Sequence, residues 1–156
     1  MAAARTYSTA KAFRTALEER LKRTAQADGM DLNRLRRQVS FDRLLARLFH
    51  SETVPWVLKG GYSLELRFKN ARATVDIDLT LQRVPATTME SSGINAVVQR
   101  MLQSATETPV NDGFEFAIGS PVMDLTAAPC GGACYPVETR MAERTFTRFH
   151  LDAGIG

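Results

Sequence analysis

Two aspartates in the stretch WVLKGGYSLELRFKNARATVDIDLTL, residues 56–81, are the first candidates for chemistry. Asp76 and Asp78 alternate with apolar residues across 74–81, which predicts a β-strand with both carboxylates on one face. Two residues of strand rise by roughly 7 Å, so both side chains can reach one metal ion. Like charges on one face repel unless a cation lies between them, and an all-oxygen site suits Mg²⁺. The pair therefore predicts a magnesium site.

A glycine pair ahead of these aspartates predicts a phosphate site. The apolar run 54–58 indicates a short buried strand that ends at Gly60 and Gly61, where a ligand can approach the backbone closely. Residues 62–68 then open a helix whose free N–H groups point back at the turn. We expect a triphosphate to bind there, with further contacts from Lys59, Ser63 and Arg72. Either motif alone is commonplace, and their combination favours a functional site.

These motifs together resemble the nucleotidyltransferase superfamily of the DNA polymerase beta type. The segments LKGGYSL and RATVDIDL are similar to the AbiEii/AbiGii toxin family within it, as are FDRLLARL near residue 45 and RFHLD near residue 150. The resemblance implies an α/β (α+β) fold with a mixed sheet of about five strands flanked by helices. It also implies that Thr74 belongs to the nucleotide site. One departure is the fourteen-residue gap between Gly61 and Asp76, which is long for the superfamily.

The same resemblance implies an enzyme that transfers a nucleoside monophosphate from an NTP to an acceptor, with tRNA or another RNA as the acceptor. It implies a cytoplasmic toxin of a toxin-antitoxin or phage-defence system, partnered by a cognate antitoxin. Asp76 and Asp78 would hold Mg²⁺, and Asp152 would orient the attacking hydroxyl. Two alternatives are a non-catalytic module that binds nucleic acid or an antitoxin, and a metal-dependent phosphatase or nuclease. The two aspartates argue against the first, and the glycine turn with Ser63 argues against the second.

The third carboxylate of the site has three candidates. The period-two pattern in 145–152 places Asp152 on a mostly polar face, together with Phe146, Arg148 and His150. The family resemblance favours Asp152 as the third metal ligand. Asp124 and Glu115 also lie near predicted strands and are the competing choices.

Composition predicts one soluble globular domain over residues 1–156. The chain is 44% hydrophobic and 24% charged, and it contains no apolar run long enough to span a membrane. Residues 1–50 hold eleven Lys or Arg and five Asp or Glu, whereas the remainder has a net negative balance. This asymmetry predicts a basic helical arm that binds the acceptor through Arg34, Arg36 and Arg37. The alternative is a pair of solvated amphipathic helices.

The elements that must position these residues follow from hydrophobic periodicity. Helices are predicted over 8–25, 32–49 and 88–105, and strands over 114–118, 134–141 and 145–152. Asp31 is the predicted N-cap of the second helix. That helix is expected to turn Leu35, Val39, Leu45, Leu48 and Phe49 toward the core, and Arg43 and Arg47 elsewhere. The pattern Thr87-x-x-Glu90 has the form of a capping box.

Two further features lie near the end of the chain, a pair of cysteines and the last three residues. Cys130 and Cys134 flank a glycine turn, and a zinc site would need two further ligands, for which only His50 and His150 are available. Free thiols are therefore expected. The sequence closes on Gly154-Ile155-Gly156 without a further helix, so we expect a chain truncated relative to the family, which carries a further helical portion.

Overall fold

The computed structural model describes residues 9–59, 76–82, 93–124 and 132–155. Several predictions concern positions outside these residues, so the structure says nothing about them. They include the glycine turn, the helix that follows it, the capping box and the start of the helix predicted from residue 88. Residues Gly60, Gly61, Ser63, Arg72, Thr74 and Cys130 lie outside the described part as well.

Two helices joined by a short turn open the described chain. Helix α1 spans Ala10–Asp28, and the Thr9 side chain caps it by accepting a hydrogen bond from the Ala12 N–H at 3.0 Å. It ends at Gly29, whose φ of 64° is the left-handed conformation that glycine adopts without strain. Helix α2 spans Leu32–Leu48, and the Asp31 side chain accepts from the Asn33 N–H, as predicted for its N-cap. The predicted helical pair is confirmed.

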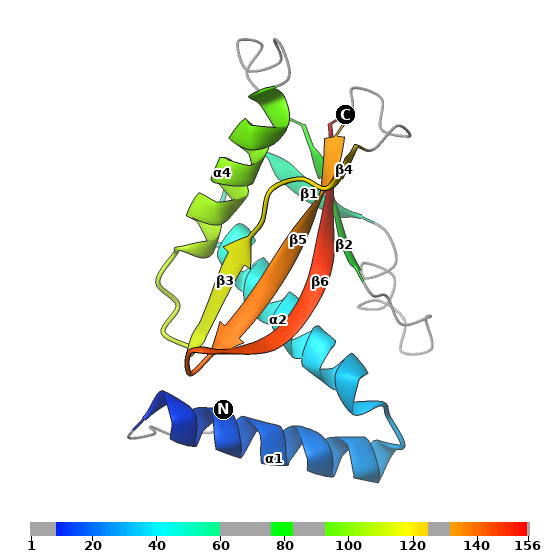
Figure 1. Ribbon diagram of the computed structural model, residues 1–156, viewed down its shortest axis with the longest axis vertical. Helices are drawn as coiled ribbons and strands as arrows, with labels where there is room; N and C mark the ends of the chain where they lie inside the picture. The colour runs from blue at the N-terminus through cyan, green and yellow to red at the C-terminus, as the bar shows by residue number, and fades with distance from the viewer. Residues whose placement is uncertain (1–8, 60–75, 83–92, 125–131, 156) are drawn as a thin grey trace.

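Within the described residues, six strands form one mixed sheet in the order β1-β2-β6-β5-β3, with β4 paired to β5 (Figure 1). Their bounds are Trp56–Lys59 (β1), Asp76–Leu81 (β2), Phe114–Ile118 (β3), Met123–Asp124 (β4), Gly132–Met141 (β5) and Arg144–Ile155 (β6). The central β2–β6 pair is parallel and the other pairs are antiparallel. The predicted α+β fold with a mixed sheet is confirmed. Only the two-residue β4 was not predicted.

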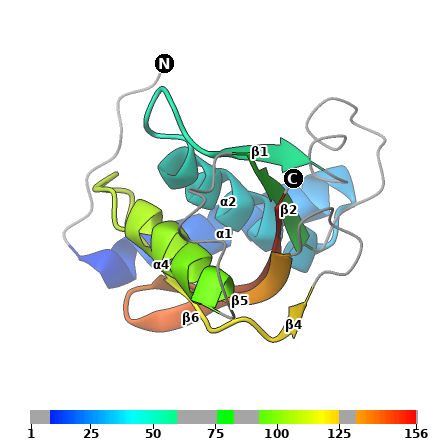
Figure 2. The same ribbon diagram turned by 90° about the horizontal axis from the view of Figure 1, so that it is seen from above.

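Helices α2 and α4 (Ile94–Thr106) pack on one face of the sheet, which we call the closed face (Figure 2). Phe41 of α2 meets Phe149 of β6 edge to face, with ring centroids 4.8 Å apart. The Tyr135 hydroxyl of β5 donates to the Asn95 carbonyl of α4 at 2.9 Å. Within the described residues no helix lies over the opposite face, the open face, which looks toward the viewer in Figure 1.

Two sequence-based assignments to faces are wrong. Phe146 was placed with the polar residues of β6 but is buried, and its ring meets Phe114 edge to face at 5.6 Å. A register shift between Thr139 and Arg140 leaves Phe146 opposite no residue of β5, so its side chain turns inward. Phe49 was expected in the core but is 38% exposed, because it lies beyond the last turn of α2.

Arg47 was also expected on an outer face of α2, yet it is only 4% exposed. Its guanidinium donates to both Asp112 carboxylate oxygens, at 2.9 and 2.5 Å, and to the Phe114 carbonyl at 2.9 Å. It also lies 5.0 Å from the centre of the Phe116 ring. A buried arginine is tolerated here because its donors are paired. The ion pair therefore fixes the start of β3 against α2.

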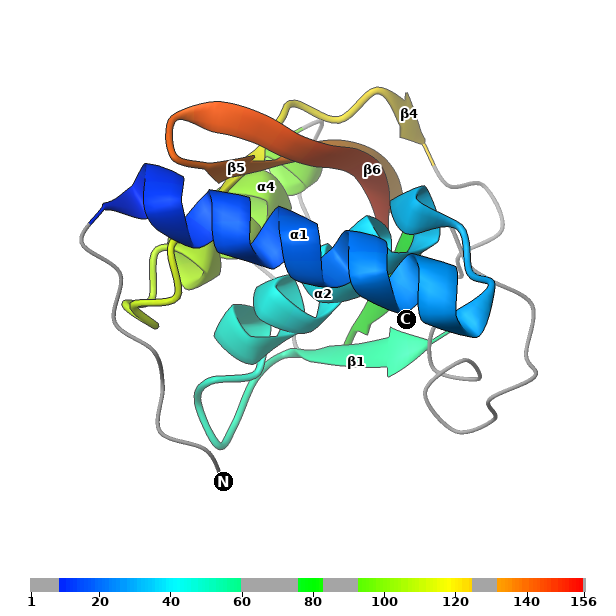
Figure 3. The ribbon, with the colours of Figure 1, turned by 90° about the horizontal axis from the view of Figure 1, so that it is seen from below.

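Helix α1 crosses the turn between β5 and β6 (Figure 3). The Arg14 guanidinium donates to the carbonyls of Met141, Arg144 and Thr145 at 2.9, 3.1 and 2.9 Å. One side chain thus satisfies three carbonyls at the tip of the longest hairpin. None of the helices in the described ranges has the length and apolar character needed to cross a membrane.

Candidate active site

Four side chains form a row across the open face of the sheet. The register pairs Lys59 of β1 with Asp78 of β2, Asp78 with Asp152 of β6, and Asp152 with Cys134 of β5. Residues paired in this way point to the same face, and neighbouring strands lie about 4.8 Å apart. Two carboxylates 74 positions apart in the sequence are thereby adjacent, between a lysine and a thiol. The predicted alternation is confirmed over Asp76–Leu81 and over residues 147–152, with Phe146 as the exception in β6.

The electrostatics of Asp78 show the cost of this arrangement. Burial, and next the negative charge of Asp152, raise the pKa of the Asp78 carboxyl, and the nearby Lys59 ammonium offsets part of that rise. A carboxylate with a raised pKa is a charge that the fold does not fully compensate. The position therefore favours the arrival of a cation.

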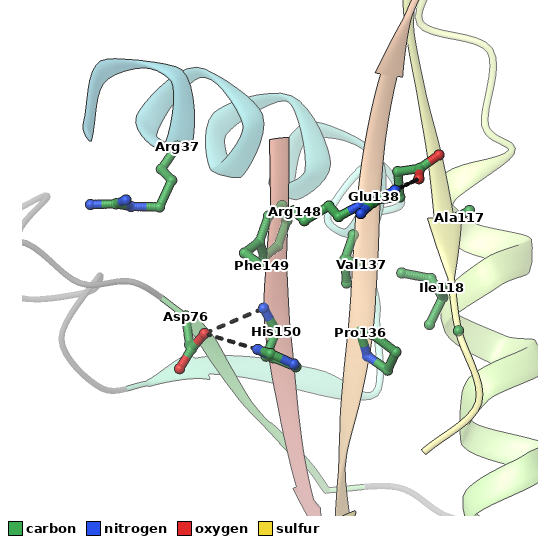
Figure 4. A pocket seen from close by; sticks show the side chains of 11 residues that line it. Arg37, Asp76, Ala117, Ile118, Pro136, Val137, Glu138, Arg148, Phe149 and His150 are labelled. Carbon is green, nitrogen blue, oxygen red and sulfur yellow. Dashed lines mark hydrogen bonds and ion pairs between the residues drawn. The ribbon is translucent and has the colours of Figure 1, made fainter. Parts of the chain in front are cut away.

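Asp76 lies in a second row of the open face, opposite His150. Its Oδ1 atom accepts a hydrogen bond from the backbone N–H of His150 at 3.3 Å and lies 3.8 Å from the imidazole Nδ1 (Figure 4). The carboxylate is therefore held toward β6, one row away from Asp78 and Asp152. Among the described residues, no three His, Cys, Asp or Glu side chains converge closely enough to hold a metal ion.

Cys134 is a buried free thiol next to Asp152. Burial, a hydrogen bond with Asp152 and the negative charges of Asp152 and Asp76 raise the pKa of the thiol to about 12. The thiol is therefore protonated at neutral pH and donates to the carboxylate. A free thiol was predicted, but its contact with Asp152 was not, because the register between distant strands is invisible in the sequence.

A groove of about 720 Å³ extends from the second row across β6, β5 and β3. At one end lie Arg37 and Asp76, and at the other lie Pro136, Ala117 and Ile118, with His150 between them (Figure 4). Arg148 and Glu138 form the third row, where an ion pair of 3.2 Å joins them. The Arg148 and Arg140 guanidiniums lower the pKa of Glu138 by more than burial raises it. The groove thus combines charged walls with an apolar end.

The other candidates for the third carboxylate lie elsewhere. Glu115 is on β3 and pairs with Arg140, so β5 and β6 separate it from β2. Asp124 is on β4, which pairs with β5 and is equally remote from β2. Asp152 is the only one of the three candidates whose strand is bonded directly to β2.

Comparison with known families decides the classification. Residues 43–156 match the family described as nucleotidyl transferase AbiEii toxin of type IV toxin-antitoxin systems. The chain belongs to this AbiEii family. It is therefore a nucleotidyltransferase of the toxin type, as the sequence motifs predicted. None of the curated proteins matches it.

Membership of the AbiEii family implies a divalent metal, and the residues present fit one. Asp76, Asp78 and Asp152 carry carboxylate oxygens, the donor type of a magnesium site, on one face of adjacent strands, although no three such side chains converge on one point within the described residues. Burial, and next the Asp152 charge, raise the pKa of Asp78, so a cation bound at this row would stabilise its ionised form. Asp76 is turned to His150, so it is the ligand whose side chain would have to reorient. With these carboxylates, the AbiEii site has the donor chemistry that Mg²⁺ prefers.

The arginines predicted to contact the acceptor occupy different settings in this AbiEii chain. The Arg36 guanidinium donates to Glu18 of α1, at 3.1 and 2.7 Å, so it joins the two helices. Arg37 lines the groove, and its Nε is buried with no hydrogen-bond partner in the described structure. Arg34 is partly buried on the same helix and does not line the groove.

Proposed function

We propose that this protein transfers a nucleoside monophosphate from an NTP to the hydroxyl of an RNA acceptor, and that Mg²⁺ supports the reaction. The main support for this proposal is the register pairing of Asp78 with Asp152 on the open face, with Asp76 two residues before Asp78 on β2. Family membership gives the reaction class. The identity of the acceptor, with tRNA as one candidate, and the metal are parts of the proposal.

The transfer is a displacement at the α-phosphorus of the NTP. The hydroxyl oxygen of the acceptor forms a bond to that phosphorus, while the bond to the oxygen bridging to the β-phosphate breaks. Pyrophosphate leaves with the electron pair, and the hydroxyl proton passes to solvent. Attacking and leaving oxygens lie roughly in line. When bound at the carboxylates, Mg²⁺ neutralises the charge that develops on the phosphate oxygens.

The residues of the chain have distinct roles in this proposal. Asp76 and Asp78 bind the metal, and Asp152 orients the attacking hydroxyl. Lys59 is the register partner of Asp78, and the chain enters the segment with Gly60, Gly61 and Ser63 directly after it. A triphosphate held by these residues, with Arg72 and Thr74, would therefore lie on the β1 side of the carboxylates.

RNA as the acceptor is supported by the charge of the N-terminal third, where basic residues outnumber acidic ones by six. Of the predicted acceptor-binding arginines, Arg37 is the best placed, because it lines the groove and has an unsatisfied buried donor. Arg34 and Arg36 remain part of the proposal as flanking charge. A type IV toxin also implies an antitoxin partner and an intracellular site of action.

The direct test incubates the protein with each labelled NTP, Mg²⁺ and total cellular RNA, and records which material gains label. Label in RNA that depends on Mg²⁺, and that is lost in Asp76→Asn, supports the proposal. Label in protein alone would replace RNA with a protein acceptor. No label with any nucleotide, although labelled NTP binds, would favour a non-catalytic binding module.

A further inference from the structure

We propose that the β5–β3 half of the groove binds the terminal nucleotide of a single-stranded RNA acceptor, with its base on Pro136 and Ala117 and its phosphate at Arg148. This inference rests on the proposed function, since it names where the acceptor of that reaction lies. Three features of the open face support it.

The first feature is the order of the strands. The proposed triphosphate site follows Lys59 on β1, the carboxylates are on β2 and β6, and the groove continues over β5 and β3. An in-line displacement requires the attacking oxygen and the leaving pyrophosphate on opposite sides of the α-phosphorus. With pyrophosphate on the β1 side, as the proposed function has it, the attacking hydroxyl comes from the β5 side. The groove begins there, beside Asp76 and His150.

The second feature is the chemistry of the far end of the groove. Pro136 and Ala117 present small apolar side chains that leave room for a flat ring, and Gly119 adds none (Figure 4). The Gly119 N–H donates to the Pro136 carbonyl at 2.7 Å, so this wall is held in place by the backbone. A volume of about 720 Å³ is within the range of small-ligand sites and accommodates a nucleotide. An unpaired base, whose face is free to stack on these side chains, suits this end better than a paired one.

The third feature is the direction in which the charges run. Two residues of strand separate successive rows, a step of roughly 7 Å, so Arg148 lies two steps from Asp152 along β6. The Arg148 side chain is 74% exposed, and Glu138 holds it at 3.2 Å over β5. Arg140 follows on β5, and Arg144 begins β6 at the hairpin tip. The basic residues therefore lead from the carboxylates toward α1, a path that suits the backbone of a strand.

The experiment measures RNA and nucleotide binding separately. The probe is a fluorescein-labelled single-stranded RNA of about ten nucleotides with a free 3′ hydroxyl, followed by anisotropy. The second probe is a fluorescent NTP analogue with Mg²⁺. Ala117→Trp fills the groove from β3, and Arg148→Gln removes the phosphate contact. Arg23→Gln is the matched control, because Arg23 is exposed on α1 and does not line the groove.

We expect Ala117→Trp and Arg148→Gln each to weaken RNA binding by about tenfold, the effect of losing one charged or stacking contact. NTP binding should be unchanged in both, and Arg23→Gln should leave RNA binding within twofold or so. Arg148→Gln should also reduce the slope of log affinity against log salt by about 0.7. A duplex of the same sequence should bind wild type more weakly than the single strand.

Several results would overturn this assignment. Loss of NTP binding in Ala117→Trp would make the groove the nucleotide site. Equal weakening by Arg23→Gln and Arg148→Gln would reduce RNA binding to diffuse charge. RNA binding that no groove variant changes, or that wild type lacks, would leave the groove to another class of partner such as the antitoxin. If wild type transfers no nucleotide while both groove variants still weaken RNA binding, the proposed reaction fails and the groove assignment stands.

Discussion

The two faces of the sheet are built from the same strands, yet their side chains are in opposite environments. On the closed face Ile77, Leu79 and Leu151 are fully buried under helices, and the Tyr135 hydroxyl donates to the Asn95 carbonyl of α4. On the open face Asp76, Asp78 and Asp152 alternate with those same residues, and the protein compensates the charge of Asp78 only in part. Each of these strands thus contributes buried apolar side chains to the core on one face and charged side chains to the candidate site on the other. Substitutions on the closed face should therefore change stability, and those on the open face should change activity.

The largest expected effect is on the open face. Asp78→Asn keeps the size of the side chain but removes the charge of a proposed metal ligand, so nucleotidyl transfer should fall by about 100- to 1,000-fold. Single-turnover assays with labelled NTP and Mg²⁺ measure this. The far-UV spectrum should be unchanged. Near-normal transfer by this variant would remove Asp78 from the metal site.

On the closed face, a substitution is expected to lower stability. Leu151 lies between His150 and Asp152 and is fully buried. Leu151→Ala should lower the free energy of unfolding by about 3–4 kcal/mol, through lost burial and the cavity that remains. Urea denaturation measures this, with Asp152→Asn as the adjacent open-face control. Comparable destabilisation by both variants would break the distinction between the faces.

A somewhat smaller effect should follow from breaking the ion pair at the edge of the closed face. Arg47→Met leaves Asp112 without its main partner, so the free energy of unfolding should fall by about 3 kcal/mol. In wild type, Arg47, Phe114 and Arg43 lower the pKa of Asp112 by more than burial raises it. This stabilisation is present above the unfolded pKa and disappears as pH falls through the folded one. The gap between variant and wild type should therefore narrow in strong acid, and a gap independent of pH would mean that lost packing dominates.

The smallest expected effect is a change in stability caused by a substitution on the open face. The pKa of Asp78 is raised in the folded state, so its ionised form costs stability at neutral pH, and that cost is relieved as pH falls through the folded pKa. Asp78→Asn should stabilise the metal-free protein by a few tenths of a kcal/mol at pH 7. The gain should vanish at low pH. Thermal melting with a chelator present measures it, and a destabilised variant at pH 7 would show that the carboxylate has a structural role.

Local patterns in the sequence predicted much of this architecture. The alternation in β2 and β6 was sufficient to place Asp76, Asp78 and Asp152 on polar faces, and Asp31 marked the start of α2. Applied to β5, the same alternation would have placed Pro136 and Glu138 on the open face. These features depend only on residues close in the chain, where side-chain period decides the outcome.

What the sequence could not predict depends on distant contacts. The parallel pairing that sets Asp78 beside Asp152 has no local signature. Arg47 was predicted to be exposed because it is charged. It is buried because it forms an ion pair with Asp112, which lies 65 residues away in the sequence. Phe41 and Leu44 of α2 are buried in the core, although hydrophobic periodicity did not predict that they face it. The two residues of β4 are too few to show any period.

The position of β6 in the sheet has a consequence for how the toxin comes into being. This strand lies between β2 and β5, although it follows both in the sequence. During translation, the ribosome therefore releases Asp78 long before Asp152, its register partner on β6. Until β6 is made, the nascent chain lacks Asp152, the residue proposed to orient the acceptor hydroxyl. If Asp152 has the proposed role, a cell that makes this enzyme is exposed to its chemistry only after β6 has been inserted between β2 and β5.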